Sequence, residues 1–439
     1  MNKKFTWLLF SLILIASVVL SACGTAATPT PTAVPPTAVP PTAVPPTAVP
    51  PTDTVAPTAV PATATVAPTA APTQAPLVIG MILVGPYNDG GWSQATYEGV
   101  QYAIGKMPGS SLVYIDNAYS QKTTPVQQAE QLLTQGAKVV IFNSDSFMDD
   151  SNTFAAAHPD VNVIMLSGDQ NWADGQNYKN IPNMIDIMGR MEYMKQIAGC
   201  AAALTTTTGK IGFLGPLINS ETRRLADSAF LGAQYCWTKV LNKKAADLTF
   251  SVTWIGNWFN IPGQTLDPTQ VADTFYTTGY DVVISGIDTT EALVEAKKQT
   301  DAGKKVFAIP YDFKDACTQA PAVCLGVPYF NWGPAMLKNL QDIAAGTMKA
   351  HFEWNQPDWA NFGSPDSGAV GFNIGQALSA DNKTALQKFI TDLAGGLNLW
   401  TGPINLQDKT VYLKDGEVAT DQQIWYAPQL LAGMDGKSK

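Results

Sequence analysis

The chain has 439 residues, of which 46% are hydrophobic and 14% are charged, and its formal net charge is −9. A chain of this length can bury one large core or two moderate ones. Nucleic acids and anionic lipid headgroups are bound through basic patches, so an acidic chain is not expected to bind either of them. The two histidines, His158 and His351, are far apart, so the sequence gives little basis for a metal site or for histidine-dependent catalysis.

The N-terminus has the features of a secretion signal. Two lysines precede an apolar run at residues 8–20, and this run is shorter than the roughly 20 residues that a membrane-spanning helix needs. The following sequence, LSACG at residues 20–24, resembles a bacterial lipobox. We therefore expect a signal peptide over residues 1–22 and a lipid on the thiol of Cys23. The acyl chains would anchor the protein at the extracytoplasmic face of the cell membrane.

A low-complexity linker follows the lipidation site, over residues 23–76. The phrase PTAVP occurs four times between Pro31 and Pro50, and related phrases continue to Pro76. Such proline density favours polyproline II, at about 3.1 Å per residue, so the linker could reach roughly 160 Å. We interpret it as a spacer, the alternative being recognition of its proline motifs by a partner.

From Leu77 the sequence alternates between strand-like and helix-like patterns. Strands are predicted over residues 77–85, 111–117, 138–144, 161–168, 210–216, 248–256, 280–286 and 304–312. Helices are predicted over residues 93–107, 125–136, 190–209, 221–241, 268–279 and 291–303. Continuous Val/Ile-rich strands between amphipathic helices indicate an α/β fold with parallel sheets covered on both faces. Two such series, 77–168 and 210–312, favour two lobes over a single large sheet.

Four cysteines remain after Cys23, and an exported protein can form disulfides. Cys317 and Cys324 bracket a short turn-like loop, and we expect them to pair. Cys200 and Cys236 lie on helices that flank the predicted strand at 210–216, and a second disulfide is expected there, with two buried free thiols as the alternative. No histidine lies near a cysteine in a motif of a thiol enzyme.

Aromatic residues together with Asp or Asn follow nearly every predicted strand. In a parallel sheet, ligands bind beyond the carboxyl ends of the strands, where these loops meet. The residues concerned are Asn88, Asp89 and Trp92; Asp145, Phe147 and Asp149; Asn257, Trp258 and Phe259; Asp288; Tyr311 and Asp312; and Asn331 and Trp332. Each alone has an ordinary structural interpretation as a cap, turn or packing residue. Together they predict a cleft for a planar ligand that forms hydrogen bonds.

Several phrases carry a resemblance to a known family. They are GPYNDGGWSQATYEGV at 85–100, TGKIGFLG at 208–215, SAFLGAQ at 228–234, VTWIGNWFNI at 252–261, NWGPAMLKNLQDIAAGT at 331–347 and LWTGPINLQDKTVYLKDGEVATDQQI at 399–424. In this order the phrases resemble the basic-membrane-protein (BMP/PnrA-like) family of lipoprotein substrate-binding proteins for ABC transporters. The phrases from 252 and 331 are similar to a Trp-rich branch of that family.

The resemblance implies a type I periplasmic-binding-protein fold, with two Rossmann-like lobes joined by a hinge. The first lobe would comprise about residues 77–187 and a segment after 325, and the second about 188–315 and part of the C-terminus. The resemblance further implies a purine nucleoside or nucleobase as ligand and ABC permease subunits as partners. It implies no catalytic residue and no cofactor.

The ligand-binding residues that the family motifs imply come from both lobes. They are Asn88, Asp89, Trp92, Phe147, Asp149, Trp258, Phe259, Asp288, Asp312 and Trp332. Trp92 stands where the family has an aromatic residue that stacks on the base, and Trp258 with Phe259 would form the second aromatic wall. The chain departs from the nucleoside-binding branch in two places, because Asn331 and Trp332 replace a lysine and Asn260 replaces an aspartate.

Three alternatives remain open at the level of sequence. A sugar also presents an apolar face to Trp and hydroxyl groups to Asp and Asn, so the ligand could be a sugar or another small polar molecule. The binding protein could serve a receptor-coupled sensor rather than an importer. An exported carbohydrate hydrolase would need a pair of carboxylates, for which Asp89 with Asp149 or Asp312 are the candidates.

Overall fold

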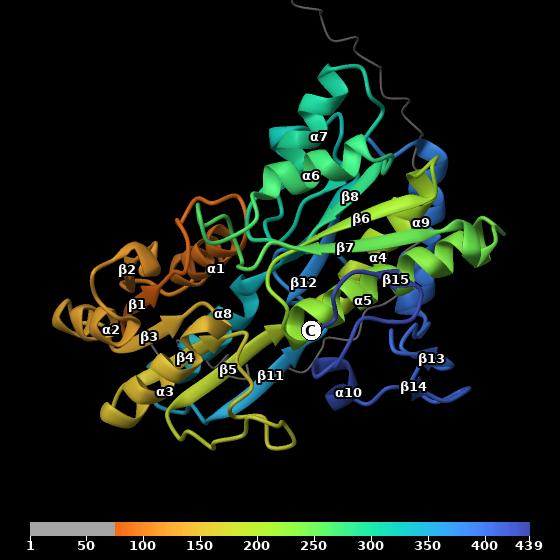
Figure 1. Ribbon diagram of the computed structural model, residues 1–439. Coiled ribbons are helices and arrows are strands. Elements are labelled where there is room, and N and C mark those ends of the chain that lie inside the picture. The colour runs from red at the N-terminus through yellow and green to blue at the C-terminus, as the bar shows by residue number, and fades with distance from the viewer. Residues whose placement is uncertain (1–74) are drawn as a thin grey trace, which may run out of the picture. The chain divides into compact units, whose positions relative to one another are not determined.

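Two parallel β-sheets organise residues 75–439, which are the residues that this computed structural model describes (Figure 1). The expected signal peptide, the lipidation site at Cys23 and nearly all of the linker lie outside the described residues. The two sheets with their covering helices are called the first and second lobe below.

The first sheet has six strands in the order β11-β5-β4-β3-β1-β2, and all its pairings are parallel. Its strands are β1 (Val78–Ile82), β2 (Ser111–Ile115), β3 (Val139–Phe142), β4 (Asn162–Leu166), β5 (Met184–Gly189) and β11 (His351–Asn355). The apolar β3 is buried at every residue, as expected for a central strand covered on both faces.

The second sheet has five strands in the order β15-β7-β6-β8-β9, again with parallel pairings only. Its strands are β6 (Lys210–Gly215), β7 (Thr249–Trp254), β8 (Val282–Ser285), β9 (Phe307–Ile309) and β15 (Met434–Asp435). The C-terminal β15 thus completes a sheet that begins more than two hundred residues earlier in the chain. Two antiparallel pairs lie outside the large sheets, namely β10 (Gly326–Phe330) with β12 (Val370–Ile374), and β13 (Ile404–Asn405) with β14 (Val411–Leu413).

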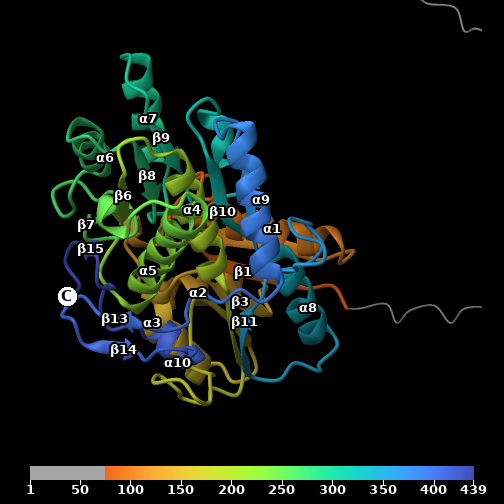
Figure 2. The same ribbon diagram turned by 90° about the vertical axis from the view of Figure 1, so that its right-hand side faces the viewer.

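Helices connect the strands and cover the sheets. They are α1 (Trp92–Gly105), α2 (Pro125–Thr134), α3 (Met148–Ala157), α4 (Met191–Thr205), α5 (Ser220–Tyr235), α6 (Pro268–Thr277), α7 (Glu291–Asp301), α8 (Trp332–Ala344), α9 (Ala380–Ala394) and α10 (Asp421–Trp425). Their starts follow local chemistry: the Thr124 hydroxyl caps α2, and Asp267 caps α6, whose first residue is Pro268. Figure 2 shows α9 beside α4, although the two are distant in sequence.

The chain passes between the lobes several times. It leaves the first sheet after β5, builds the second sheet from β6 to β9, and returns through β10 to α8 and β11. It then runs through β12 and α9 to the second sheet, which it joins at β15. Multiple crossings of this kind suit a hinge between two lobes.

The α/β prediction with parallel sheets is confirmed, and each predicted strand and helix has an observed counterpart. Sequence reasoning missed α3 between two predicted strands. Residues 149–152 of α3 read Asp-Asp-Ser-Asn, and such residues are weak helix formers. Strand β5 was also not among the predicted strands.

Both expected disulfides are present. The Cys200–Cys236 bond joins α4 to the turn that ends α5, with the Cα atoms 5.2 Å apart, and the Cys317–Cys324 bond closes the loop before β10. The helices α4 and α5 pack closely because Gly199 has no side chain: a Cβ there would lie 1.8 Å from the carbonyl oxygen of Ala229.

Candidate functional site

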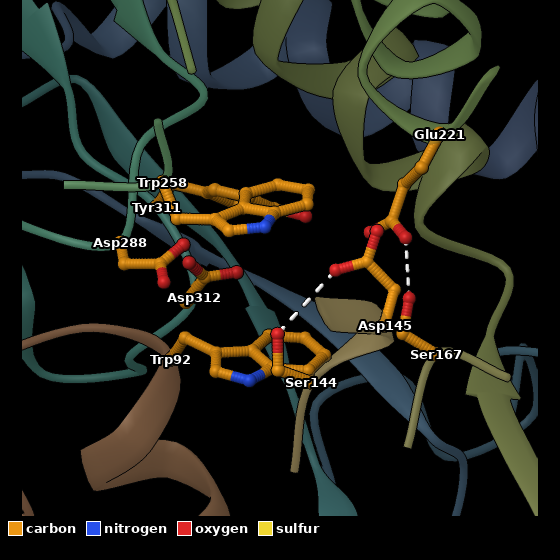
Figure 3. Close-up of a pocket in the computed structure, with 9 residues that line it drawn as sticks. All are labelled: Trp92, Ser144, Asp145, Ser167, Glu221, Trp258, Asp288, Tyr311 and Asp312. Carbon is orange, nitrogen blue, oxygen red and sulfur yellow. Dashed lines mark hydrogen bonds between the residues drawn. The ribbon is translucent and has the colours of Figure 1, made fainter. Parts of the chain in front are cut away.

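A pocket lies where the carboxyl ends of strands from both sheets meet (Figure 3). It is lined by Trp92, Ser144, Asp145 and Ser167 from the first lobe and by Glu221, Trp258, Asp288, Tyr311 and Asp312 from the second. Each of these residues follows a strand, in the order β1, β3, β4, β6, β7, β8 and β9. The position is the one that ligands take in open parallel sheets.

Two indole rings bound the pocket on opposite sides, Trp92 from the first lobe and Trp258 from the second (Figure 3). The Trp92 indole N–H donates to the carbonyl oxygen of Asn143, and its ring rests edge-on against Trp332, with ring centroids 5.4 Å apart. The Trp258 backbone is held by Asp288, whose N–H donates to its carbonyl oxygen at 3.0 Å. The Trp92 indole is therefore fixed by its own hydrogen bond and the Trp258 indole is positioned through its backbone, and both rings offer a flat face to a planar group.

Asp288 and Asp312 lie together at one end of the pocket (Figure 3). Asp312 is fully buried, and neither of its carboxylate oxygens has a hydrogen-bond partner among the described residues. Burial raises the pKa of Asp312 well above its usual value, while the charge of Lys195 acts in the opposite direction. Burial, and then the charge of Asp312, likewise raise the pKa of Asp288. Asp312 also has a left-handed backbone, with φ 69°, a conformation that is often retained at functional sites.

Asp145 and Glu221 lie at the opposite end, where the protein itself supplies their partners. The Asn219 amide donates to Asp145 at 3.1 Å, and the Ser167 hydroxyl donates to Glu221. Both bonds join the first lobe to the second. Burial raises the pKa of Asp145, and it raises the pKa of Glu221 to about 7. The indole N–H of Trp258 is directed toward Asp145 but makes no hydrogen bond of standard geometry.

Lys195 of α4 lies against the ring of Tyr311, and a role for it near the pocket was not expected from the sequence. Its side chain is buried, its Nζ donates to the carbonyl oxygen of Ser285 at 2.8 Å, and Nζ lies 3.2 Å from the centroid of the Tyr311 ring. Burial lowers the pKa of Lys195 to about 7, against the opposing effect of the Asp312 charge. A lysine inside an apolar helix carries no sequence signal for such a position.

The loop after β1 touches the second lobe at Gly91. A Cβ on Gly91 would lie 1.7 Å from the carbonyl oxygen of Asp288, so only glycine permits this approach. The structure therefore has the two lobes in contact at both ends of the pocket, through Gly91 and Asp288 at one end and through the Asn219–Asp145 bond at the other.

Of the predicted ligand-binding residues, Trp92, Trp258, Asp288 and Asp312 line the pocket. Asn88 is exposed and does not line it. Asp89 instead holds the start of α1, because its carboxylate accepts hydrogen bonds from the backbone N–H groups of Gly91, Ser93 and Gln94.

The remaining predicted residues lie around the pocket rather than in its lining. Phe147 is fully buried in the first core, because a 3-10 turn directs it inward. Asp149 is exposed at the start of α3, where it lies 3.6 Å from the Nζ of Lys179. Phe259 packs at the edge of the core, and Trp332 is buried and stacked on Phe330, with ring centroids 4.7 Å apart.

The list of ligand-binding residues implied by the family motifs did not include Ser144, Asp145, Ser167, Glu221 or Tyr311, although all five line the pocket and Asp145 and Tyr311 were among the strand-exit residues that predicted the cleft. Asp145 and Tyr311 follow predicted strands and carried the same signal as the residues that were chosen. Ser144, Ser167 and Glu221 also occupy strand exits, but Ser and Glu at such positions are common in turns and first helical turns.

Two further features bear on function. Within residues 75–439, no group of three or more His, Cys, Asp or Glu side chains is arranged to hold a metal ion. Over the same residues, no helix is both long and apolar enough to cross a membrane.

Comparisons with known proteins place the chain in a family. The family model described as ABC transporter substrate-binding protein, PnrA-like, matches residues 77–373. A purine-binding protein of Brucella abortus is 26% identical over 366 residues, covering 82% of this chain and 93% of that protein. A protein of Haloferax volcanii, named as an ABC transporter glucose-binding protein, is 23% identical over 330 residues, covering 73% of each chain.

The solved structures support the same fold. A solute-binding protein of an ABC transporter system from Aeropyrum pernix aligns with a TM-score of 0.56 at 12% identity, covering 75% of this chain and 93% of that one. The expected type I periplasmic-binding-protein fold is thereby confirmed. The chain belongs to the PnrA-like family of ABC transporter substrate-binding proteins.

Proposed function

We propose that this protein binds a purine nucleoside or nucleobase outside the cytoplasm and delivers it to an ABC importer, while a lipid on Cys23 holds it at the membrane. The ligand would bind between the two lobes, in the pocket bounded by Trp92 and Trp258.

The observation that carries the proposal is the pair of indole rings on opposite sides of the pocket, one from each lobe (Figure 3). Stacking of a base on an aromatic ring contributes roughly 1–3 kcal/mol. Asp288 and Asp312 would accept hydrogen bonds from the N–H groups of the base, and Asp145 and Glu221 from hydroxyl or amino groups at the other end. The purine-binding relative of Brucella abortus adds support, because its alignment spans most of both chains.

A neutral sugar is the second candidate ligand. The relative from Haloferax volcanii is named for glucose, and sugar rings also stack on Trp while donating hydroxyl hydrogen bonds to carboxylates. The hydrolase alternative has less support. Asp149 does not line the pocket, and Asp89 uses its carboxylate to hold α1, so neither candidate pair with Asp89 faces a common ligand.

Calorimetric titration distinguishes the two ligands. Adenine, adenosine, guanosine, inosine and glucose are titrated into the mature protein after it has been unfolded, dialysed and refolded to remove any ligand carried from the cell. We expect at least one purine compound to bind with a dissociation constant well below about 1 mM. Binding of glucose alone would contradict the purine assignment and leave the family assignment intact.

The anchor and the partner need separate tests. Cys23→Ser should abolish incorporation of radiolabelled palmitate, because the thiol is the acyl acceptor, and labelling at the wild-type level would contradict the lipid anchor. Crosslinking of the protein in its native membrane, followed by mass spectrometry, distinguishes an importer from a sensor: capture of a permease subunit supports transport, and capture of a receptor contradicts it.

A further inference from the structure

The lining of the pocket is strongly unbalanced in charge. Of the nine residues that line it, Asp145, Glu221, Asp288 and Asp312 are acidic, and none is basic. Asp89 lies near enough to raise the pKa values of Asp288 and Asp312 further. A closed pocket of this composition holds several carboxyl groups out of water, which disfavours their charged form, so that each group either binds a proton or is compensated by a bound cation.

Two buried cations act on these carboxyl groups from outside the lining: the charge of Arg224 lowers the pKa of Glu221, and the charge of Lys195 lowers the pKa of Asp312. The Arg224 Nε donates to the carboxylate of Glu192 at 2.6 Å, and the Arg224 guanidinium rests on Trp425, 4.1 Å from the ring centroid. The Lys195 Nζ lies against the Tyr311 ring, and burial lowers the pKa of Lys195 to about 7. The lining itself contains four acidic groups and no basic one, and burial favours the protonated form of these acids until a cation binds beside them.

The unpaired acceptors are directed at the space between the indoles. Both carboxylate oxygens of Asp312 are buried without a partner, and the carboxylate of Asp288 accepts no hydrogen bond from residues 75–439. Figure 3 shows these two groups between the levels of Trp258 and Trp92, at the edge where a ring stacked between the indoles would end. Indole faces attract cations, with the largest effect where water is excluded.

We propose that the ligand carried by this protein is positively charged, namely a purine-type ring that is itself cationic or bears a protonated amine. The inference rests on the proposed function and narrows it. The ring would stack between Trp92 and Trp258 with its charge toward Asp288 and Asp312, so that the aromatic faces and the unpaired carboxylates act on the same group. A neutral purine would gain the stacking but leave the carboxylates without a counter-charge.

The test uses isomers that differ in charge. 1-Methyladenosine is a cation near neutral pH, and its isomer N6-methyladenosine is neutral. A second pair places the methyl group and the charge at another edge of the ring: 7-methylguanosine is the cation just below neutral pH, and 1-methylguanosine is its neutral isomer. Each compound is titrated calorimetrically into the refolded protein. We expect at least one cation to bind at least about tenfold more tightly than its neutral isomer.

Variants assign the effect to the proposed residues. Asp312→Asn and Asp288→Asn keep the shape of the side chain and remove its charge, and each should reduce the preference for the cation about tenfold or more. Asp301→Asn removes the same charge from the exposed end of α7 and should leave the preference unchanged. Using two pocket variants keeps the test decisive if one of them folds poorly.

The outcomes separate this inference from the proposed function. Neutral isomers that bind as tightly as the cations, or more tightly, overturn the charged ligand but leave the purine assignment standing. Binding of thiamine, a planar cation that is not a purine, without binding of any purine would support the charge and contradict the purine class. Binding of glucose alone would overturn both.

Discussion

The two ends of the pocket contain the same chemical groups in opposite states of pairing. At one end, Asp145 and Glu221 accept hydrogen bonds from Asn219 and Ser167, and each of these bonds links one lobe to the other. At the other end, Asp288 and Asp312 belong to the same lobe and have no protein donor among the described residues. The paired carboxyl groups link the lobes and have only part of their acceptor capacity left for a ligand, whereas all acceptor sites of the unpaired ones are available. Position in the pocket, rather than residue type, therefore determines what each acidic side chain does.

Preventing the contact between the lobes should lower ligand affinity most, because the groups at both ends of the pocket come together only when the lobes are in contact. In Gly91→Ala, the added Cβ would overlap the carbonyl oxygen of Asp288, and we expect affinity for the ligand to fall by about a hundredfold or more, roughly 3 kcal/mol. Calorimetric titration measures this loss. The matched control is Gly105→Ala at the end of α1, where a Cβ meets nothing within 4 Å and affinity should not change. Wild-type affinity in Gly91→Ala would show that binding does not need this contact.

Removing one aromatic wall should lower ligand affinity less than preventing contact between the lobes does. Trp258→Ala should lower affinity tenfold to a hundredfold, because one stacking face worth about 1–3 kcal/mol is lost. Trp258→Phe should recover much of the affinity. The melting temperature of the ligand-free protein serves as the check on structure: a collapse of folding in Trp258→Ala would show that the indole is a core residue and not a binding surface.

The pH should change the closure of the ligand-free protein through the buried carboxyl groups at both ends of the pocket. Burial in the closed state raises the pKa values of Asp288 and Asp312, and it raises that of Glu221 to about 7 from an ordinary value of 4.5. The closed state therefore binds more protons than a solvated open state, and closure should become more favourable as the pH falls from about 7 to about 4, by about 1.4 kcal/mol for each unit of pKa difference.

This pH dependence is measurable as a distance between spin labels on the two lobes, for example at Gln131→Cys and Lys297→Cys on the exposed faces of α2 and α7. The native cysteines of the described residues are in disulfides and should not react. Asp312→Asn should weaken the dependence. An opening of the lobes as the pH falls would have the wrong sign and would contradict the account of the pocket.

The paired end should give the smallest change. Asn219→Ala removes the donor to Asp145 and should weaken ligand affinity by about 0.5–1.5 kcal/mol, because one hydrogen bond between the lobes is lost. Asn219 also caps α5, so Asn219→Ser, which keeps a capping oxygen, separates the two roles. Ligand affinity that is unchanged in both variants would show that the Asn219–Asp145 bond does not contribute to closure.

The sequence predicted the fold and four residues of the pocket lining because both follow from strand patterns. Buried parallel strands are continuous apolar runs, and Trp92, Trp258, Asp288 and Asp312 stand directly after such runs. The same rule also selected Phe147 and Asp149, which lie on turns whose direction the sequence did not reveal. A 3-10 turn buries Phe147, and the unrecognised helix α3 carries Asp149 away from the pocket.

The pairing of the carboxyl groups could not be predicted, because it depends on contacts between distant segments. Ser167 and Glu221 are 54 residues apart, and Asp145 and Asn219 are 74 residues apart. Lys195 was missed for a related reason, since only the packing of α4 against the second sheet places its Nζ over Tyr311. The residues that follow strands can thus be predicted from a sequence, whereas the hydrogen-bond partners of those residues can be known only from the closed structure.

A crystal structure of the refolded protein with the tightest-binding purine from the titrations would locate the ligand directly. We predict that the ring lies between Trp92 and Trp258, with its hydrogen-bond donors on the carboxylates of Asp288 and Asp312 and the Asn219–Asp145 bond intact. A ligand bound outside this pocket, or in the pocket with both indoles off its ring faces and no contact to Asp288 or Asp312, would contradict the account.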